Sequence, residues 1–131
     1  MQMRMSFHHV CIETNTYTES ICFYQKLFAF DIIEESKGFH GREYNTWLKN
    51  GDIIIELQTP KGDHSKINYQ LGTIGIMHIC FVVNNLDEEI KRIKELGFNI
   101  FKDGKEKYEI CGKYITKIVA PEGTVIELRE Y

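Results

Sequence analysis

Two glutamates, Glu56 and Glu127, each lie inside a short run of β-branched and other apolar residues. Such runs are typical of buried or half-buried strands, where an unpaired ionised carboxylate is costly and needs a cation, a base or a metal ion. A histidine in another apolar run precedes each glutamate, and the separations are nearly equal: 47 residues from His9 to Glu56 and 49 from His78 to Glu127. This repeated His…Glu pattern predicts a metal site.

Strand parity predicts on which side these residues lie, because alternate residues of a strand face opposite sides of a sheet. In all four runs the face opposite the candidate ligand is the more apolar one, suited to carry a helix. The residues of that face are Val10, Ile12, Ile55, Leu57, Ile79, Phe81, Ile126 and Leu128. Two modules that curl toward each other would therefore bring two histidines and two glutamates into one concavity.

Two imidazoles and two carboxylates suit one divalent ion, Zn²⁺, Ni²⁺, Co²⁺, Mn²⁺ or Fe²⁺. An open coordination position would accept two substrate oxygens and stabilise the enediolate that forms when a C–H next to a carbonyl loses its proton. Glu127 or Glu56, loosened from the ion, could act as the base. Taken singly, each His or Glu is also compatible with an ordinary surface residue, and the shared spacing and parity favour the metal site.

Other histidines and cysteines are interpreted as structural or surface residues. His8 faces the apolar side of its strand, and His40 and His64 lie in loops. Cys11 and Cys80 share the faces of His9 and His78, where small packing residues are expected.

One order of elements recurs along the chain, so we predict an α+β fold of two tandem βαβββ modules in a single domain, 1–131. The first module covers about residues 6–58 and the second about 76–131, with a linker over 59–75. The linker forms a candidate pocket wall, and Ser65 could cap a short helical turn through Gln70.

Alternation and helical spacing locate the elements of both modules. In the first we expect strand 6–13, helix 17–28 with a Thr16–Glu19 capping box, strand 29–33, a glycine-containing connection over 36–42, and strands 43–49 and 52–58 around an Asn50-Gly51 hairpin. In the second we expect strand 76–84, helix 86–96, strand 97–101, a charged loop over 102–107, and strands 113–120 and 124–130.

Composition indicates an ordinary globular protein of 131 residues, 43% hydrophobic, with a formal net charge of −3. That charge favours neither a nucleic-acid nor an anionic membrane surface, and no apolar run approaches the roughly 20 residues of a membrane span. We find no signal-peptide pattern at the N-terminus. The four scattered cysteines indicate reduced packing residues, so a cytoplasmic location is expected.

The chain resembles the vicinal-oxygen-chelate superfamily, which includes glyoxalase I, methylmalonyl-CoA epimerase, extradiol dioxygenases and the fosfomycin and bleomycin resistance proteins. The resemblance covers essentially the whole chain. The segments that carry it are His9-Val10, 23–30, Ile55-Glu56-Leu57, His78-Ile79 and 121–128. It implies an eight-stranded, cup-shaped mixed sheet around a divalent metal ion, with Ni, Zn or Co first and Mn or Fe next, and it implies a homodimer.

Four filled ligand positions, His9, Glu56, His78 and Glu127, look more like glyoxalase I or the epimerase than like the dioxygenases or fosfomycin enzymes. The resemblance therefore implies a lyase or isomerase acting on a thiol adduct of a 2-oxoaldehyde, with methylmalonyl-CoA epimerase as the alternative. Bacterial glyoxalase I holds a glutathione carboxylate with an arginine at the position of Glu13, so the identity of the substrate thiol is left open. The alternative of another class is a non-catalytic protein that sequesters a small molecule.

Overall fold

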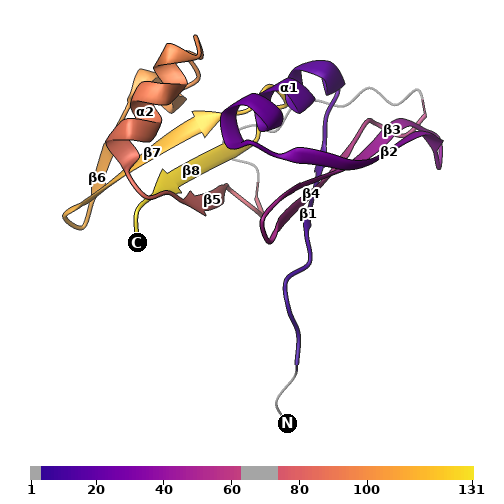
Figure 1. Ribbon diagram of the computed structural model, residues 1–131, viewed down its shortest axis with the longest axis horizontal. Coiled ribbons are helices and arrows are strands. Elements are labelled where there is room, and N and C mark those ends of the chain that lie inside the picture. The colour runs from indigo at the N-terminus through magenta and orange to yellow at the C-terminus, as the bar shows by residue number, and fades with distance from the viewer. Residues whose placement is uncertain (1–3, 63–73) are drawn as a thin grey trace. The chain divides into compact units, whose positions relative to one another are not determined.

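The computed structural model describes residues 4–62 and 74–131, which form two compact units, one on each side of the undescribed segment (Figure 1). The expected helical turn from Ser65 to Gln70, and most of the expected linker, lie outside the described residues. Within the described ranges, neither helix has the length and apolar character needed to span a membrane.

Unit 1, the part of the chain before this segment, contains one helix and four strands. Its elements are β1 (Val10–Glu13), α1 (Tyr17–Phe28), β2 (Asp31–Phe39), β3 (Arg42–Asn50) and β4 (Ile53–Gln58). The strands form a mixed sheet in the order β1-β4-β3-β2, in which β1 is parallel to β4 and the other pairs are antiparallel. Strand β4 therefore has a neighbour on both sides.

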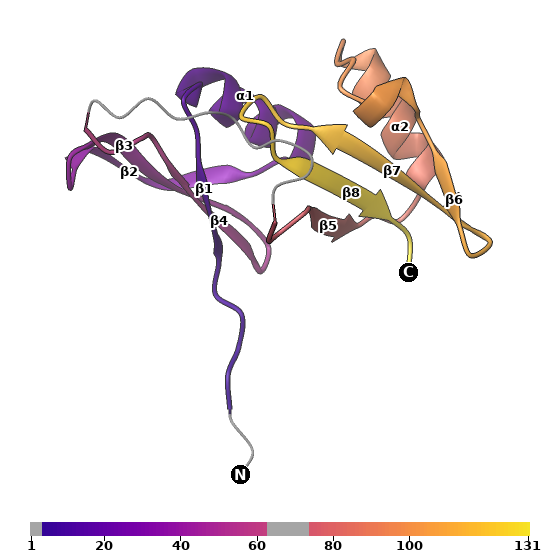
Figure 2. The same cartoon turned by 180° about the vertical axis from the view of Figure 1, so that it is seen from behind.

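Unit 2 repeats this arrangement, as Figure 2 shows from behind. Its elements are β5 (Ile79–Val82), α2 (Leu86–Glu95), the 3₁₀ turn η1 (Lys102–Gly104), β6 (Tyr108–Ile110), β7 (Lys113–Val119) and β8 (Val125–Arg129). The sheet order is β5-β8-β7-β6, with β5 parallel to β8. The predicted α+β class and the two tandem βαβββ modules are confirmed. The union of both sheets into one eight-stranded cup stays a prediction.

The predicted strand faces are confirmed by burial. Ile55 and Leu57 of β4, and Ile126 and Leu128 of β8, are 0% exposed. Fully burying one such side chain contributes roughly 1.5–3 kcal/mol. A register slip of one residue would turn these side chains to the opposite face, so burial fixes the side on which the intervening Glu56 and Glu127 lie.

Helix α1 begins and ends where the sequence predicts, but the predicted capping box is wrong. Thr16 is the N-cap residue and its side chain makes no capping hydrogen bond. Instead, the Thr14 hydroxyl accepts a hydrogen bond from the backbone N–H of Thr16 at 3.0 Å and contacts the Ser20 hydroxyl at 2.8 Å. A buried contact between the hydroxyls of Thr14, before the helix, and Ser20, in its first turn, thus takes the place of the expected Thr16–Glu19 hydrogen bonds.

Strand β2 is longer than predicted. It runs to Phe39 through residues expected to form a connection, and the chain reverses at His40 and Gly41 instead. Both residues have positive φ, 47° and 79°. Two successive residues of positive φ make the tight hairpin turn that matches strand twist, which allows β2 and β3 to pair along most of their length.

The strand predicted over 97–101 is wrong. Phe101 forms a single isolated bridge with Ile118, and the third strand of unit 2 is β6, in a stretch for which no element was predicted. Asp103 and Gly104 have positive φ, 56° and 69°, so the chain turns away after that bridge. Strand pairing begins again at Tyr108, which lies opposite Ile115. A tight turn at Cys111 and Gly112 joins β6 to β7.

Two matched threonines generate a stability prediction. Thr46 and Thr116 lie opposite Leu57 and Leu128, and both are 0% exposed. The Thr46 hydroxyl bonds to the Tyr17 hydroxyl at 2.6 Å, whereas the Thr116 hydroxyl has no hydrogen-bond partner among the described residues.

We expect Thr116→Val to raise the free energy of unfolding by about 1 kcal/mol, because valine removes an unsatisfied buried hydroxyl without changing the shape. Thr46→Val should lower it by about 1 kcal/mol, because it removes a made hydrogen bond. Urea denaturation of both variants measures the difference. Destabilisation by Thr116→Val equal to that by Thr46→Val would contradict the assignment.

Candidate metal centre

The two candidate glutamates occupy equivalent places on the central strands β4 and β8. In register, Glu56 lies between Cys11 of β1 and Trp47 of β3, and Glu127 lies between Cys80 of β5 and Lys117 of β7. Their side chains are 16% and 12% exposed. Both carboxylates therefore need nearby partners to offset partial burial.

A histidine faces each of these carboxylates. His9, directly before β1, has its Nε2 3.5 Å from Glu56 Oε1, and His78, directly before β5, has its Nε2 3.5 Å from Glu127 Oε2. The prediction that His and Glu share one face within each module is confirmed. The convergence of all four residues on one ion stays a prediction. Within the described ranges, no group of three or more His, Cys, Asp or Glu has the spacing to hold a metal ion.

The distance within each pair fits metal ligation better than hydrogen bonding. An N–H···O bond spans roughly 2.7–3.2 Å. Two ligands about 2.1 Å from one ion are separated by roughly 3.0 Å in octahedral and 3.4 Å in tetrahedral geometry. In each pair the imidazole nitrogen and the carboxylate oxygen are 3.5 Å apart, which is close to the separation of two ligands in tetrahedral geometry. Each unit thus offers two donors, and a closed zinc-type site needs four.

Two cysteines that were expected only to pack lie against the glutamates. Burial, a hydrogen bond to Glu56 and the charge of Glu56 raise the pKa of Cys11 to about 12. Burial, a hydrogen bond to Glu127 and its charge raise the pKa of Cys80 to about 11. Both side chains are therefore neutral thiols at physiological pH in the metal-free protein.

His9 has aromatic neighbours that the sequence interpretation did not include. His8 was excluded as a ligand, and its Nδ1 lies 2.7 Å from His9 Nδ1. The Trp47 ring packs edge-on against the His9 ring with centroids 4.7 Å apart. A second ring nitrogen held by a neighbour fixes both tautomer and orientation of a ligating imidazole, so His8 and Trp47 restrain His9.

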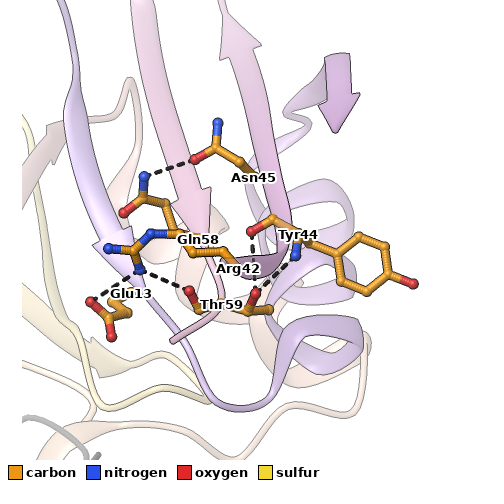
Figure 3. A network of polar contacts seen from close by, with 6 residues as sticks. All are labelled: Glu13, Arg42, Tyr44, Asn45, Gln58 and Thr59. Carbon is orange, nitrogen blue, oxygen red and sulfur yellow. Dashed lines mark hydrogen bonds and ion pairs between the residues drawn. The ribbon is translucent and has the colours of Figure 1, made fainter. Parts of the chain in front are cut away.

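Glu56 has an amide partner, Asn45 of β3. Asn45 Nδ2 donates to Glu56 Oε2 at 3.3 Å. Gln58 Nε2 donates to Asn45 Oδ1 at 2.8 Å, as Figure 3 shows. Gln58 lies two residues after Glu56 in β4 and therefore on the same face of the sheet. Asn45 was missed, although its even spacing from Trp47 and its place in a strand beside β4 put it on the same face.

Glu13, which replaces the arginine of bacterial glyoxalase I, is paired with another arginine. Arg42 Nη1 lies 3.6 Å from Glu13 Oε2 and also donates to the Thr59 carbonyl at 2.8 Å (Figure 3). The Thr59 hydroxyl accepts from the Tyr44 backbone N–H at 2.8 Å, which holds the ends of β3 and β4 together. This corner therefore carries one charge of each sign.

The remaining candidates lie away from these pairs. His40 is in the β2–β3 turn, and His64 lies outside the described residues. The charged loop over 102–107 contains η1 and is ion-paired to α2 of its own unit, through Lys107–Asp87 at 2.5 Å and Lys94–Glu106 at 2.7 Å.

The βαβββ repeat agrees with comparisons to known proteins. Residues 6–128 match the model of the Glyoxalase/Bleomycin resistance protein/Dioxygenase superfamily. The chain therefore belongs to this superfamily.

Particular relatives extend the match over nearly the full length. The uncharacterized protein YwkD of Bacillus subtilis (strain 168) is 28% identical over 126 residues, which cover 95% of this chain and 96% of that protein. The fosfomycin resistance protein FosX from Listeria monocytogenes, solved with Mn(II), has a TM-score of 0.72 at 18% identity, covering 97% of this chain and 90% of that one. Lactoylglutathione lyase from Agrobacterium tumefaciens has a TM-score of 0.71 at 18% identity, covering 98% and 96%. Likeness at such identities shows the fold alone.

The raised pKa values of Cys11 and Cys80 predict their reactivity in metal-free protein. Because the thiolate is the nucleophile, iodoacetamide at pH 7.5 should modify both at least about 100-fold more slowly than Cys111, although all three residues are exposed. Their rates should climb with pH up to the raised values. Mass spectrometry of peptides after timed quenching measures each site.

Glu56→Gln supplies the internal control for this measurement. It removes the charge beside Cys11, so Cys11 should react faster while Cys80 keeps its rate. Equal rates at Cys11 and Cys111 in the parent would show that the carboxylate does not hold the thiol protonated.

Proposed function

We propose that this chain is a metal-dependent lyase or isomerase of the glyoxalase I type. One divalent ion, with Ni²⁺, Zn²⁺ or Co²⁺ preferred and Mn²⁺ or Fe²⁺ next, would be held by His9, Glu56, His78 and Glu127. The observation that carries the proposal is the duplicated pair: in each unit, an imidazole nitrogen lies 3.5 Å from a carboxylate oxygen at the same strand position.

When bound, the ion supplies Lewis-acid polarisation of adjacent substrate oxygens, which makes a neighbouring C–H more acidic. His9 and His78 would each supply one imidazole nitrogen to the ion, from the same face of the sheet as the glutamate of their own unit. Glu127 or Glu56 accepts the proton from carbon and returns it to the adjacent carbon. The thiol adduct of a 2-oxoaldehyde thereby becomes the thioester of a 2-hydroxy acid, with no net change in atoms or electrons.

Partial burial suits the two glutamates to this role. Their side chains, 16% and 12% exposed, lie on central strands, each beside a thiol of the parallel neighbour, Cys11 or Cys80. A carboxylate poorly solvated by water competes better for a proton on carbon, because fewer water molecules must be displaced before transfer. The likeness in fold to lactoylglutathione lyase is compatible with this chemistry.

The corner formed by Glu13 and Arg42 favours a second candidate substrate. A lone arginine at position 13 would attract a glutathione carboxylate, whereas the ion pair of Arg42 with Glu13 is neutral overall. A substrate that is not held through a glutathione carboxylate at this corner is therefore the alternative. Methylmalonyl-CoA, whose own carboxylate would be held elsewhere, requires the same removal of a proton next to a carbonyl. For either reaction we propose a homodimer as the working form.

Metal-free protein reloaded with Ni²⁺, Co²⁺ or Zn²⁺ should turn over either the methylglyoxal–glutathione adduct or methylmalonyl-CoA. Glu127→Gln should lower kcat by about 10²–10⁴-fold, the usual contribution of a positioned base. Glu130→Gln, three residues along the chain and exposed, is the matched control and should keep the parent rate.

Three outcomes would contradict the proposal in different ways. Full activity of Glu127→Gln would remove its assigned role. Bound metal with no turnover of either substrate would leave the site and reject the reaction. A parent protein that binds no metal but retains a small molecule would identify a sequestering protein.

A further inference from the structure

The two candidate glutamates differ in one neighbour. Both contact a thiol from the adjacent parallel strand, Cys11 or Cys80, and both face a histidine. Only Glu56 also accepts a hydrogen bond from an amide of the antiparallel neighbour, Asn45.

Strand register shows why unit 2 lacks this contact. Asn45 pairs with Gln58, two residues beyond Glu56, and the matching pair in unit 2 is Ile115 with Arg129, two residues beyond Glu127. Ile115 carries no donor, and Arg129 Nε donates to the Glu130 carbonyl. The amide chain is therefore a feature of unit 1 added to a duplicated His–Glu pair.

The geometry fixes which end of the Asn45 amide faces Glu56. Asn45 is 2% exposed, so water does not compete for its side chain. Because the Gln58 amide N–H₂ donates to Asn45 Oδ1 at 2.8 Å, the Asn45 nitrogen is turned to the other side, where it donates to Glu56 Oε2 at 3.3 Å. A flipped Asn45 would place two donors, and then two acceptors, against each other.

The two oxygens of Glu56 consequently have separate partners. Oε2 is held by Asn45, whereas Oε1 lies 3.5 Å from His9 Nε2. A carboxylate fastened by one oxygen keeps the other aimed in one direction. Outer partners of this kind orient the inner ligands of a metal ion.

We propose that Asn45 and Gln58 are positioning residues that hold Glu56 as a fixed ligand with Oε1 presented to the metal ion. This inference rests on the proposed metal site. Gln58 acts through Asn45, and Asn45 acts through Glu56. Glu127 has no equivalent amide, so the two carboxylates of the centre are held to different degrees.

Co²⁺ titration of the protein tests the positioning role without any assay of turnover. Asn45→Leu removes the donor at similar size and should weaken Co²⁺ binding about 10–100-fold, with a changed visible absorption spectrum. Gln58→Glu should weaken binding similarly, because a carboxylate at position 58 accepts the Asn45 N–H₂ and draws it away from Glu56. Calorimetry gives the affinity, and thermal unfolding gives the stability.

Thr46→Val is the matched control. Thr46 adjoins Asn45 in β3 but points to the helix-covered face, where it bonds Tyr17. It should lower stability and leave Co²⁺ affinity and spectrum unchanged, which separates positioning from general loosening of β3.

Parent-like Co²⁺ affinity and spectrum in Asn45→Leu and Gln58→Glu would overturn the positioning role and leave the proposed function standing. If Asn45→Leu does not fold, Co²⁺ binding by Gln58→Glu, at a half-buried position, tests the positioning role by itself. A parent that binds no Co²⁺ would reject the proposed metal site and, with it, this inference.

Discussion

A carboxylate in the middle of an apolar central strand is the constraint from which the rest of each unit follows. Ile55 and Leu57 must face the helix-covered core, and therefore Glu56 must face the other way; Ile126 and Leu128 impose the same on Glu127. An ionised group in that position is tolerated only with polar partners. The flanking parallel strand supplies them in both units, as a histidine at its start and a thiol two residues later.

The two units share these contacts and differ in the residues around them. The parallel neighbour of each central strand keeps the His and Cys, with the same 3.5 Å separation between imidazole and carboxylate. The antiparallel neighbour differs: Trp47 and Asn45 in β3 correspond to Lys117 and Ile115 in β7. Among the described residues, the carboxylate of Glu56 is thus held by a side-chain amide, whereas Glu127 has no such contact from its antiparallel neighbour.

The sequence carried enough information for the helices, the strand faces and both His–Glu pairs, because period and parity are set by burial alone. Strand pairing was harder. The expected turn at Asn50-Gly51 lies at Gly51 and Asp52, and Asn50 pairs with Ile53. Moving the turn by one residue shifts the register by two, which keeps every face but changes direct partners. Parity therefore survived. The expected register pairs Asn45 directly with Glu56, whereas the observed register pairs Asn45 with Gln58 and joins all three in one chain of hydrogen bonds. Strand β6 was missed because the turns on either side of it need positive φ at Asp103 and Cys111. Non-glycine residues rarely adopt positive φ, so the sequence does not indicate turns at these positions.

The proposed metal centre requires that the two His–Glu pairs hold a single ion together. Metal content after dialysis, with calorimetric affinity, tests it most directly in the parent, His9→Ala and His78→Ala. We predict one ion per chain in the parent and, in both variants, a loss of affinity larger than the about 10–100-fold expected for an outer partner. Two ions per chain, or a variant that binds one ion as tightly as the parent, would contradict it.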